Sequence, residues 1–537
     1  MLVDLGERQG SRHYNISSVK PALFPSSYQS ESSKIFFTEI INKGDPREKL
    51  FEDAKRKEIE ELINRGTFKI VLQEDLPENA NIIPSRFVLA IKNGENNKEV
   101  HKARFVLGGH RDKEKRTIVH NSTTLKQSSI RILLAMASIF GFKIWSTDIK
   151  QAYLQSASKL KRDVFIKPNI MELNHGELLQ FINALYGLTD AGDYWGEKLH
   201  SHHVKDLRMK HTTVDFSLFF KHIGNKLVGM SGSYVDDIIR CGTNKFEQSS
   251  QHMTASIFDT KKPERNSFTF TGLQVKDGNY SKSLSQSEFI GRLELLKPDC
   301  SFEDFRSTRA KLNWLTNTRP DIAFSVSRSS AVTSNTFQSN HIRDINRVIK
   351  HLKKTKYRSL RFPKLDQDSL RITTHSDASF SNNDDNSSQI RFIILLSDAT
   401  NNCAILRYSS YKSRRIARSS MAAETFAFAD AFDAAYAIKF DLEKLLNKSI
   451  PLLMLTDSKA LFDVITRSKY TTEKRLMIDI AAVRQAYNEK EINNIALIKS
   501  EFNPADGLTK LACNEALKQL LETHKISHPV EQYVIEH

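Results

Sequence analysis

Two short apolar segments in the first half of the sequence carry acidic residues that could support metal-dependent chemistry. Asp148 lies in WSTDI at residues 145–149, and the doublet Asp236-Asp237 lies between SYV and II at residues 233–239. A carboxylate beside a hydrophobic core is costly unless it is paired or bound to a metal. Three carboxylates on two neighbouring strands can hold two Mg²⁺ ions about 4 Å apart, an arrangement that supports in-line nucleotidyl transfer. A hairpin turn is the alternative explanation of the doublet, because Asp tolerates turn conformations.

Four further acidic residues follow in the last third of the sequence, in the order Asp, Glu, Asp, Asp. They are Asp377 in the strand-like segment THSDASF, Glu424 in the helical segment SSMAAETFAFADAF, Asp457 directly after the apolar segment LLMLT, and Asp506 in NPADGLTK. Each has an ordinary explanation on its own, since Asp457 could cap the following helix and Glu424 could be a first-turn acid. Only their common order on strand, helix, strand and C-terminal helix suggests a second site.

The residues around Asp236 resemble a known family. Tyr234-Val235-Asp236-Asp237 resembles the YxDD box of reverse transcriptases, and its surroundings resemble the Ty1/copia class of retrotransposon Pol proteins. The resemblance extends over collinear stretches, which are GTFKIV at 66–71, KARFVLGGHRD at 102–112, STDIKQAYLQS at 146–156, DVFIKP at 163–168, ALYGLTDAGDYW at 184–195, FTFTGLQV at 268–275 and LTNTRPDIAFSV at 315–326. Because these stretches occur in the family's order, we take the resemblance as informative for this whole region.

The resemblance implies roles for residues in this first region. Asp148, Asp236 and Asp237 would form the metal-binding triad, and Tyr153 would lie under the incoming sugar and exclude a 2′-hydroxyl. Lys102 and Arg104 alternate along one strand, so both would point to one face and clamp the triphosphate. Gly187 would lie near the template and the nucleotide. The alternatives are a core tyrosine at 153, a solvated basic face at 102–104 and a plain turn glycine at 187.

The second group of acids resembles ribonuclease H. THSDAS, ARSSMAAE and TDSKAL are similar to the boxes of copia-type elements, and the order of acids matches on strand, helix, strand and C-terminal helix. The resemblance implies that Asp377, Glu424, Asp457 and Asp506 converge and hold two Mg²⁺ ions. One ion would generate hydroxide, and the pair would stabilise the phosphorane while RNA is cut. Mn²⁺ is the alternative metal at both sites.

These resemblances imply an α+β fold in which a right-hand polymerase of fingers, palm and thumb precedes an α/β ribonuclease H-like domain with a mixed five-stranded sheet. The boundaries that we predict are a poorly ordered leader at 1–45, fingers and palm at 46–245, a mostly helical thumb or connection at 246–365, the ribonuclease H-like domain at 366–525, and a tail at 526–537. Apolar spacing predicts a helix at 47–64 and a buried helix at 128–141. The basic stretch at 350–363 is interpreted as a linker.

Composition narrows the class of partner. The 79 Lys and Arg residues exceed the 63 Asp and Glu residues, so the net charge is +16. Such an excess favours a polyanionic partner, because each cation set against a phosphate releases a counterion; a merely basic soluble protein is the alternative. The four cysteines have no CxxC spacing, which argues against a zinc ribbon or a disulfide scaffold and favours a reducing compartment. GxxxxGK[ST], HExxH and GxSxG motifs do not occur.

The expected partners are an RNA template, a DNA primer, an RNA–DNA hybrid and deoxynucleoside triphosphates, with integrase or a second copy of the chain as further candidates. No apolar run is long enough to predict a membrane span, so we expect a cytoplasmic protein within a virus-like particle, or a nuclear one. Two alternatives stay open beside an active polymerase with ribonuclease H. One is a decayed or co-opted element that binds nucleic acid without catalysis, and the other is a nuclease with only the C-terminal activity.

Overall fold

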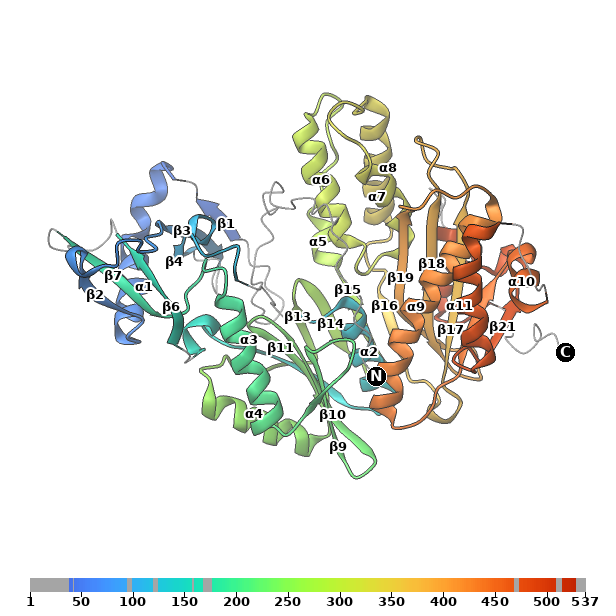
Figure 1. Ribbon diagram of the computed structural model, residues 1–537, viewed down its shortest axis with the longest axis horizontal. Helices are drawn as coiled ribbons and strands as arrows, with labels where there is room; N and C mark the ends of the chain where they lie inside the picture. The colour runs from blue at the N-terminus through green and yellow to red at the C-terminus, as the bar shows by residue number, and fades with distance from the viewer. Residues whose placement is uncertain are drawn as a thin grey trace.

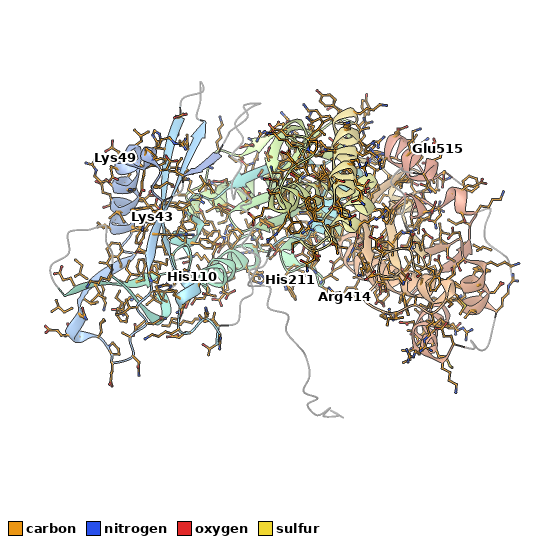
Figure 2. The ribbon with its side chains drawn as sticks, turned by 90° about the horizontal axis from the view of Figure 1, so that it is seen from above. Lys43, Lys49, His110, His211, Arg414 and Glu515 are labelled. Atoms are coloured by element: carbon orange, nitrogen blue, oxygen red, sulfur yellow. The ribbon has the colours of Figure 1, made fainter. Side chains whose placement is uncertain are left out.

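The computed structural model describes residues 38–41, 43–93, 99–118, 124–156, 159–167, 176–467, 473–508 and 514–527. Most of the predicted leader and residues 528–537 of the predicted tail lie outside these ranges. Helices and sheets are combined in separate units, so the α+β class is confirmed. Figure 1 shows the N-terminal sheets at one end of an elongated molecule and a five-stranded sheet at the other. The view from above in Figure 2 places Lys49 and Glu515 near these opposite ends.

The N-terminal end consists of two three-stranded sheets and one helix. The sheets have the strand orders β1-β3-β4 and β2-β7-β6. The bounds are β1 (Thr38–Ile41), α1 (Glu52–Asn64), β2 (Phe68–Leu72), β3 (Ser85–Asn93), β4 (Glu99–Leu107), β6 (Lys159–Ile166) and β7 (Glu177–Asn183). Helix α1 packs on β4, with Leu62 buried beside Phe105 and Phe181. The predicted helix at 47–64 is therefore present, although its first turns form a 3-10 helix at Pro46–Phe51.

A six-stranded sheet with the order β12-β5-β11-β10-β9-β8 forms the centre of the molecule. Its elements are β5 (Lys143–Asp148), β8 (Lys210–His211), β9 (Leu218–Ile223), β10 (Lys226–Tyr234), β11 (Asp237–Gly242) and β12 (Glu264–Arg265), with helices α2 (Gln127–Ile139), α3 (Ala191–Ser201) and α4 (Asn244–Ile257). Ile239 packs with α2, whereas Ile238 packs with Trp195 of α3. Alternate residues of β11 thus face opposite layers, as the strand period requires.

The region at 246–365 combines helices with a sheet. Strands β13 (Ser267–Phe270), β14 (Leu273–Asp277), β15 (Ser281–Ser285) and β16 (Leu360–Pro363) form an antiparallel four-stranded sheet, and the helices are α5 (Ser287–Gly291), α6 (Phe302–Leu315), α7 (Ala323–Ser330) and α8 (Ser339–Lys354). The prediction of a linker at 350–363 was wrong, because α8 extends to Lys354 and β16 completes the sheet. Basic residues at the end of a helix are favoured by the helix dipole, and they mimic the composition of a linker.

The C-terminal sheet is five-stranded and mixed, as predicted, with the order β19-β18-β17-β20-β21. Its strands are β17 (Arg371–Ser379), β18 (Gln389–Ser397), β19 (Cys403–Lys412), β20 (Leu452–Thr456) and β21 (Asn494–Leu497), and its helices are α9 (Ser420–Leu446), α10 (Lys459–Thr466), α11 (Met477–Asn488) and α12 (Glu515–Thr523). β17 pairs antiparallel with β18 and parallel with β20. The long helix α9 covers β17 and β18 (Figure 1).

The central and C-terminal sheets share one continuous hydrophobic core. Helix α2 contacts β10 and β11 of the central sheet and β19 of the C-terminal sheet. The buried Arg131 of α2 donates to the carbonyl oxygens of Leu406 at 3.2 Å and Asn317 at 2.7 Å, and its guanidinium lies 4.6 Å from the ring centre of Tyr408. These units therefore pack directly on one another. No helix in the part of the chain that the structure describes is both long and apolar enough to cross a bilayer.

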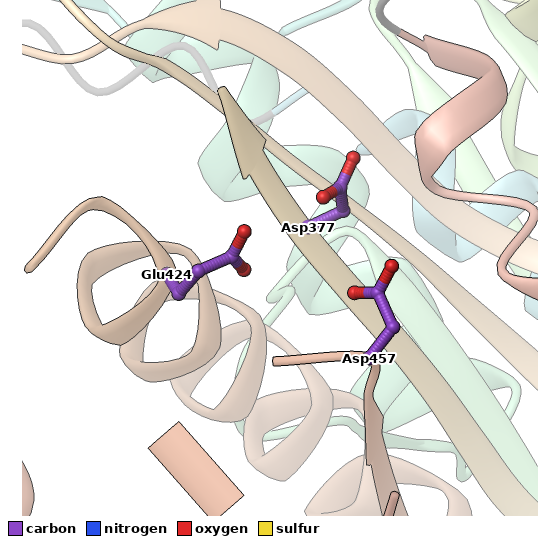
Figure 3. Close-up of side chains that lie close together, drawn as sticks. All are labelled: Asp377, Glu424 and Asp457. Carbon is purple, nitrogen blue, oxygen red and sulfur yellow. The ribbon is translucent and has the colours of Figure 1, made fainter. Parts of the chain in front are cut away.

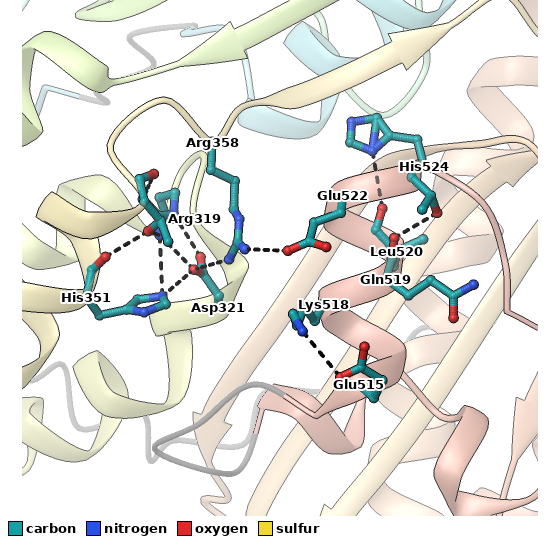
Figure 4. Close-up of polar contacts among 12 residues, drawn as sticks. Arg319, Asp321, His351, Arg358, Glu515, Lys518, Gln519, Leu520, Glu522 and His524 are labelled. Carbon is teal, nitrogen blue, oxygen red and sulfur yellow. Dashed lines mark hydrogen bonds and ion pairs between the residues drawn. The ribbon is translucent and has the colours of Figure 1, made fainter.

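A buried ionic network explains the sequence TRPDI at 318–322. Arg319 and Asp321 form a bidentate ion pair with distances of 2.9 and 2.7 Å (Figure 4). His351 and Arg358 also reach Asp321 Oδ2, and Arg358 extends to Glu522 of α12 at 3.2 Å. Burial opposes ionisation of Asp321, but the hydrogen bonds from His351 and Arg319 hold its pKa well below the usual value. The network ties α8 to the C-terminal helix.

Removing Arg319 should destabilise the fold, because Asp321 would lose its bidentate partner in a fully buried position. We expect Arg319→Met to lower the free energy of unfolding by about 3–5 kcal/mol. Urea unfolding followed by circular dichroism measures the effect. Arg347→Met is the matched control, since the Arg347–Asp344 pair is exposed and should cost less than about 1 kcal/mol. Equal losses in both variants would contradict the assignment.

Candidate functional site

The doublet Asp236-Asp237 lies at the tip of a β-hairpin. Tyr234 of β10 pairs with Asp237 of β11, so Val235 and Asp236 form a two-residue turn. Val235 has φ 55°, a conformation that is unfavourable for a β-branched residue. Its carbonyl oxygen accepts a hydrogen bond of 2.6 Å from Trp195 Nε1. The hairpin turn that was the alternative explanation of the doublet is therefore present in the backbone. The unfavourable backbone conformation at Val235 is, however, of a kind that is often found at functional sites.

Strand pairing brings the third acid to this turn. Asp148 is directly opposite Asp237 in the antiparallel pairing of β5 with β11, and the backbone N–H of Ile149 donates to the carbonyl oxygen of Asp236 at 2.9 Å. Opposite residues in such a pair have Cα atoms about 4.5–5.5 Å apart. Asp148, Asp236 and Asp237 are thus neighbours, as predicted.

The three carboxylates lie in an electrostatically unfavourable arrangement. Burial and the charge of Asp148 raise the pKa of Asp236, and burial together with Asp236 and Asp148 raises the pKa of Asp237 well above its usual value. Lys261 Nζ lies 2.9 Å from Asp148 Oδ1 and supplies one positive charge. Oxygen ligands of this kind suit Mg²⁺ or Mn²⁺, so the donor set fits a divalent ion.

Two cavities adjoin this triad. One of about 470 Å³ is lined by Tyr153, Asp236 and Asp237, and its far wall is formed by residues of β13, β14 and α5. Tyr153 packs edge-on against Tyr186 with ring centres 5.0 Å apart. The Tyr153 side chain therefore packs partly in a hydrophobic core and partly along the cavity wall. This position is compatible both with a core tyrosine and with a residue that contacts a bound nucleotide.

The other cavity, of about 360 Å³, is lined by Lys102, Arg104, Asp148 and Lys261. Lys102 and Arg104 thus lie on one face of β4, as their alternation predicted. Burial and then the neighbouring charges of Arg104 and Lys261 lower the pKa of Lys102. Arg104 also stacks 5.3 Å from the ring centre of Tyr186. The cavity is also lined by Lys57 and Lys150 and by the acids Glu58, Glu61 and Asp259, so its charge is mixed. Lys102, Arg104 and Lys261 are the cations in it that suit a phosphate group beside the triad.

Gly187 has a clear packing role. Its φ is +93°, and an added Cβ would lie 2.0 Å from the carbonyl oxygen of Leu107. The backbone N–H of Gly109 donates to the carbonyl oxygen of Gly187 at 3.1 Å. This close approach to the end of β4 accounts for glycine, so contact with a template or nucleotide at Gly187 stays a prediction.

Three of the four C-terminal acids meet in one place. Asp377 lies on β17, Glu424 on the first turns of α9, and Asp457 directly after β20, and one oxygen from each lies within 4.8 Å of the others (Figure 3). The parallel pairing of β17 and β20 brings Asp377 and Asp457 to the same edge of the sheet. This is the one group among the described residues whose His, Cys or acidic side chains meet this closely.

Asp506 lies beside this trio without joining it. It begins a 3-10 helix at Asp506–Leu508, and Asn514 Nδ2 lies 3.5 Å from its Oδ2. Its charge contributes to the raised pKa of Asp377. Asn503 connects the region to the trio by donating to Asp457 Oδ1 at 3.2 Å. The prediction that four acids converge is therefore confirmed for three of them. The fourth, Asp506, is close enough for its charge to raise the pKa of Asp377.

Simultaneous ionisation of Asp377, Glu424 and Asp457 is unfavourable in this arrangement. Burial raises the pKa of Glu424 to about 9, with further contributions from the charges of Asp377 and Asp457. Burial also raises the pKa of Asp377 to about 6, although Arg391 contacts Asp377 Oδ2. Glu424 Oε2 is buried and has no hydrogen-bond partner among the described residues. A divalent cation would be coordinated by this oxygen and would relieve the repulsion, so these residues fit a metal.

Three residues beside the acids were not predicted from the sequence. Lys261 contacts Asp148, Arg391 contacts Asp377, and the ring of Tyr186 packs against Tyr153. Lys261 reaches Asp148 from the segment before β12, and Arg391 is opposite Asp377 only because β18 pairs with β17. Nothing in the local sequence indicates either contact. Tyr186 carried a signal, because it stands in ALYGL within a stretch that resembles the family.

Several known proteins are similar to this chain in sequence or in fold. The family model described as "Reverse transcriptase (RNA-dependent DNA polymerase)" matches residues 66–297. The chain is 25% identical over 416 residues to the retrovirus-related Pol polyprotein from transposon RE1 of Arabidopsis thaliana, covering 70% of this chain and 27% of that one. It is 23% identical over 520 residues to the transposon Ty1-GR3 Gag-Pol polyprotein of Saccharomyces cerevisiae, covering 87% of this chain and 28% of that one. The chain thus spans less than a third of the length of either relative.

A solved structure shows the same fold. It is titled "Structure of the foamy viral protease-reverse transcriptase dRH in complex with ds DNA", and it matches with a TM-score of 0.52 and 12% identity. The match covers 84% of this chain and 69% of that one. At this identity the likeness concerns the fold alone.

The raised pKa of Glu424 predicts a pH-dependent stability of the metal-free chain. The folded state keeps a proton on Glu424 up to a pH of about 9, whereas the unfolded chain releases it near pH 4.5. The free energy of unfolding should therefore fall as the pH rises between these values. Glu424→Gln should flatten this slope and stabilise the chain at pH 8 by at least about 1 kcal/mol.

Urea unfolding in EDTA at pH 6 and pH 8 measures the slope. Glu515→Gln is the control, because the Glu515 side chain is 79% exposed. Identical slopes for wild type and Glu424→Gln would contradict the electrostatic account of the trio.

Proposed function

We propose that this chain, whose residues 66–297 form a reverse transcriptase domain of the Ty1/copia type, synthesises DNA on RNA or DNA templates and degrades RNA in RNA–DNA hybrids. The observation that carries the polymerase assignment is the register of β5 with β11, which sets Asp148 opposite Asp237 beside the turn at Asp236. Two cavities that share Asp236 support the same assignment, one with basic and acidic residues in its lining and the other with several aromatic residues.

The proposed domains follow the boundaries predicted from the sequence. Residues 46–245 would be the fingers and palm, with the central sheet as the palm. Residues 246–365 would be the thumb and connection, with α6, α7 and α8 as the thumb helices. Residues 366–525 would be the ribonuclease H-like domain, whose five-stranded mixed sheet is consistent with it.

In the proposed polymerase site, Asp148, Asp236 and Asp237 would hold two Mg²⁺ ions, with Mn²⁺ as a substitute. The bound metals would activate the primer 3′-hydroxyl and neutralise the leaving pyrophosphate. Lys102, Arg104 and Lys261 would bind the triphosphate, because these cations are among the residues that line the cavity beside Asp148. Tyr153 would support the sugar from the neighbouring cavity and exclude a 2′-hydroxyl.

In the proposed nuclease site, Asp377, Glu424 and Asp457 would hold the metals at the edge of the C-terminal sheet, and Asp506 would complete the set. The bound metals would supply hydroxide and stabilise the phosphorane. Asn503 would orient Asp457, because it donates to that carboxylate and to the carbonyl oxygen of Ser376. The net charge of +16 would favour binding of nucleic acid through its backbone.

The proposed partners are an RNA template, a DNA primer, an RNA–DNA hybrid and deoxynucleoside triphosphates. Integrase or a second copy of the chain would be further partners if it acts within a larger Pol assembly. A particle in the cytoplasm, or the nucleus, would be its location.

A second candidate is a decayed or co-opted element that binds nucleic acid without catalysis. The observation that favours it is that cations of the chain itself contact the acids of both sites, Lys261 at Asp148 and Arg391 at Asp377. A metal would have to displace or share these contacts. Activity measurements on the two sites separate this candidate from the first.

Asp236→Asn should abolish primer extension, because it removes one metal-binding charge while nearly preserving shape. With poly(rA) template, oligo(dT) primer, dTTP and Mg²⁺, we expect the rate to fall by at least about 10³, since metal stabilisation of the transition state is worth several kcal/mol. Asp163→Asn is the control, because Asp163 is exposed on β6 and accepts a hydrogen bond from Gln180 Nε2 on β7. If neither the wild type nor the control extends the primer, the decayed element is favoured. If Asp236→Asn still extends it, the proposed metal-binding role of the triad is wrong.

Asp457→Asn should abolish hybrid cleavage and leave primer extension unchanged. The reason is that Asp457 belongs to the C-terminal trio and not to the triad at the hairpin. A 5′-labelled RNA annealed to DNA, incubated with Mg²⁺ or Mn²⁺, reports cleavage, with a loss of at least about 10³ expected. Asp463→Asn on α10 is the control, because that residue lies outside the trio. Cleavage that persists in Asp457→Asn would remove the nuclease assignment.

A further inference from the structure

Arg391 is the buried cation of the C-terminal trio. It lies on β18 directly opposite Asp377, and only 1% of its side chain is exposed. Its Nη1 contacts Asp377 Oδ2, while Nε and Nη2 are buried without a hydrogen-bond partner among the described residues. On its other side Arg391 is opposite Ser410, whose hydroxyl donates to the carbonyl oxygen of Leu508. The guanidinium therefore has Asp377 as its direct anionic contact.

The place of this contact matters for metal binding. Asp377 has two carboxylate oxygens that could bind a metal ion in the trio. Arg391, on the neighbouring strand β18, already contacts one of them, Oδ2. A guanidinium keeps its charge at any physiological pH, and a buried one cannot reach solvent. A divalent ion bound by Asp377 would be repelled by the guanidinium that contacts the same carboxylate, and little water would screen this repulsion.

The cation of the other site differs in this respect. Lys261 contacts Asp148 through an Nζ that is also buried, but 32% of its side chain is exposed, and the flexible lysine stem offers a route to solvent or to a phosphate. Arg391 has no such freedom, because only 1% of its own side chain is exposed. The two sites thus differ in how readily their own cation can give way.

We propose that Arg391 acts as a built-in counter-cation that competes with divalent metal for Asp377, so that the C-terminal trio binds metal more weakly than its acids alone would. This inference rests on the proposed function, in that the trio is taken as a metal centre. It makes Arg391 a determinant of the metal concentration that this site needs. The polymerase triad is not affected by it.

Mn²⁺ binding to the full chain tests the proposal. Titration followed by electron paramagnetic resonance counts free Mn²⁺, and the difference between each protein and the same protein carrying Asp457→Asn isolates the C-terminal site. Arg391→Met removes the charge at similar volume, and Arg391→Gln is a second neutral variant should the first fail to fold. Arg391→Lys keeps the charge and is the matched control.

We expect the neutral variants to bind Mn²⁺ at the C-terminal site at least tenfold more tightly than wild type, and Arg391→Lys to resemble wild type. Equal or weaker binding in a folded neutral variant would overturn the proposal and would make Arg391 a support for Asp377. A site absent from every variant would overturn the metal centre itself, and with it the nuclease half of the proposed function. Primer extension would still report separately on the polymerase half.

Discussion

Carboxylates held together against their mutual repulsion are the constraint on which both candidate sites depend. Burial raises the pKa of Asp236, Asp237 and Glu424, because a charged group loses its hydration and faces like charges. The chain itself joins only Asp236 and Asp237. Strand pairing adds Asp148 through the antiparallel β5–β11 pair and brings Asp377 and Asp457 together through the parallel β17–β20 pair, while packing of α9 places Glu424. A slip of one residue would turn each side chain to the opposite face of its sheet.

The free energy that offsets this repulsion comes from the packed layers around the strands. Helix α2 is buried along nearly its whole length and packs between the central and C-terminal sheets, so one hydrophobic core supports the sheets of both sites. Arg131 on this helix binds backbone carbonyl oxygens on the neighbouring elements. The Arg319–Asp321 network performs a similar task between α8 and α12. Because these units share a core, the relative placement of the two sites is part of the fold.

The sites also share a way of supplying positive charge. Each has a cation in contact with its first aspartate, Lys261 at Asp148 from more than 100 residues away and Arg391 at Asp377 from the next strand. The Lys261 ammonium is buried, but part of its side chain is exposed, and it lines a cavity together with other basic and acidic residues. The Arg391 side chain is almost fully buried. The positive charge is therefore supplied by a lysine with a flexible, partly exposed stem in one site and by a buried arginine in the other.

The sequence by itself determined the α+β class, the mixed C-terminal sheet, the helix at the N-terminal end and the acids that converge. The fold class and the mixed sheet followed from collinear stretches that resemble a known family, whereas apolar spacing predicted the helix. The tertiary structure alone decided the rest. It showed that the basic stretch at 350–363 belongs to α8 and β16, that packing explains Gly187, that Asp506 stands beside the trio, and that Lys261 and Arg391 contact the acids. The physical reason is that strand register and layer packing bring together residues far apart along the chain, and no periodicity within a short window records such contacts.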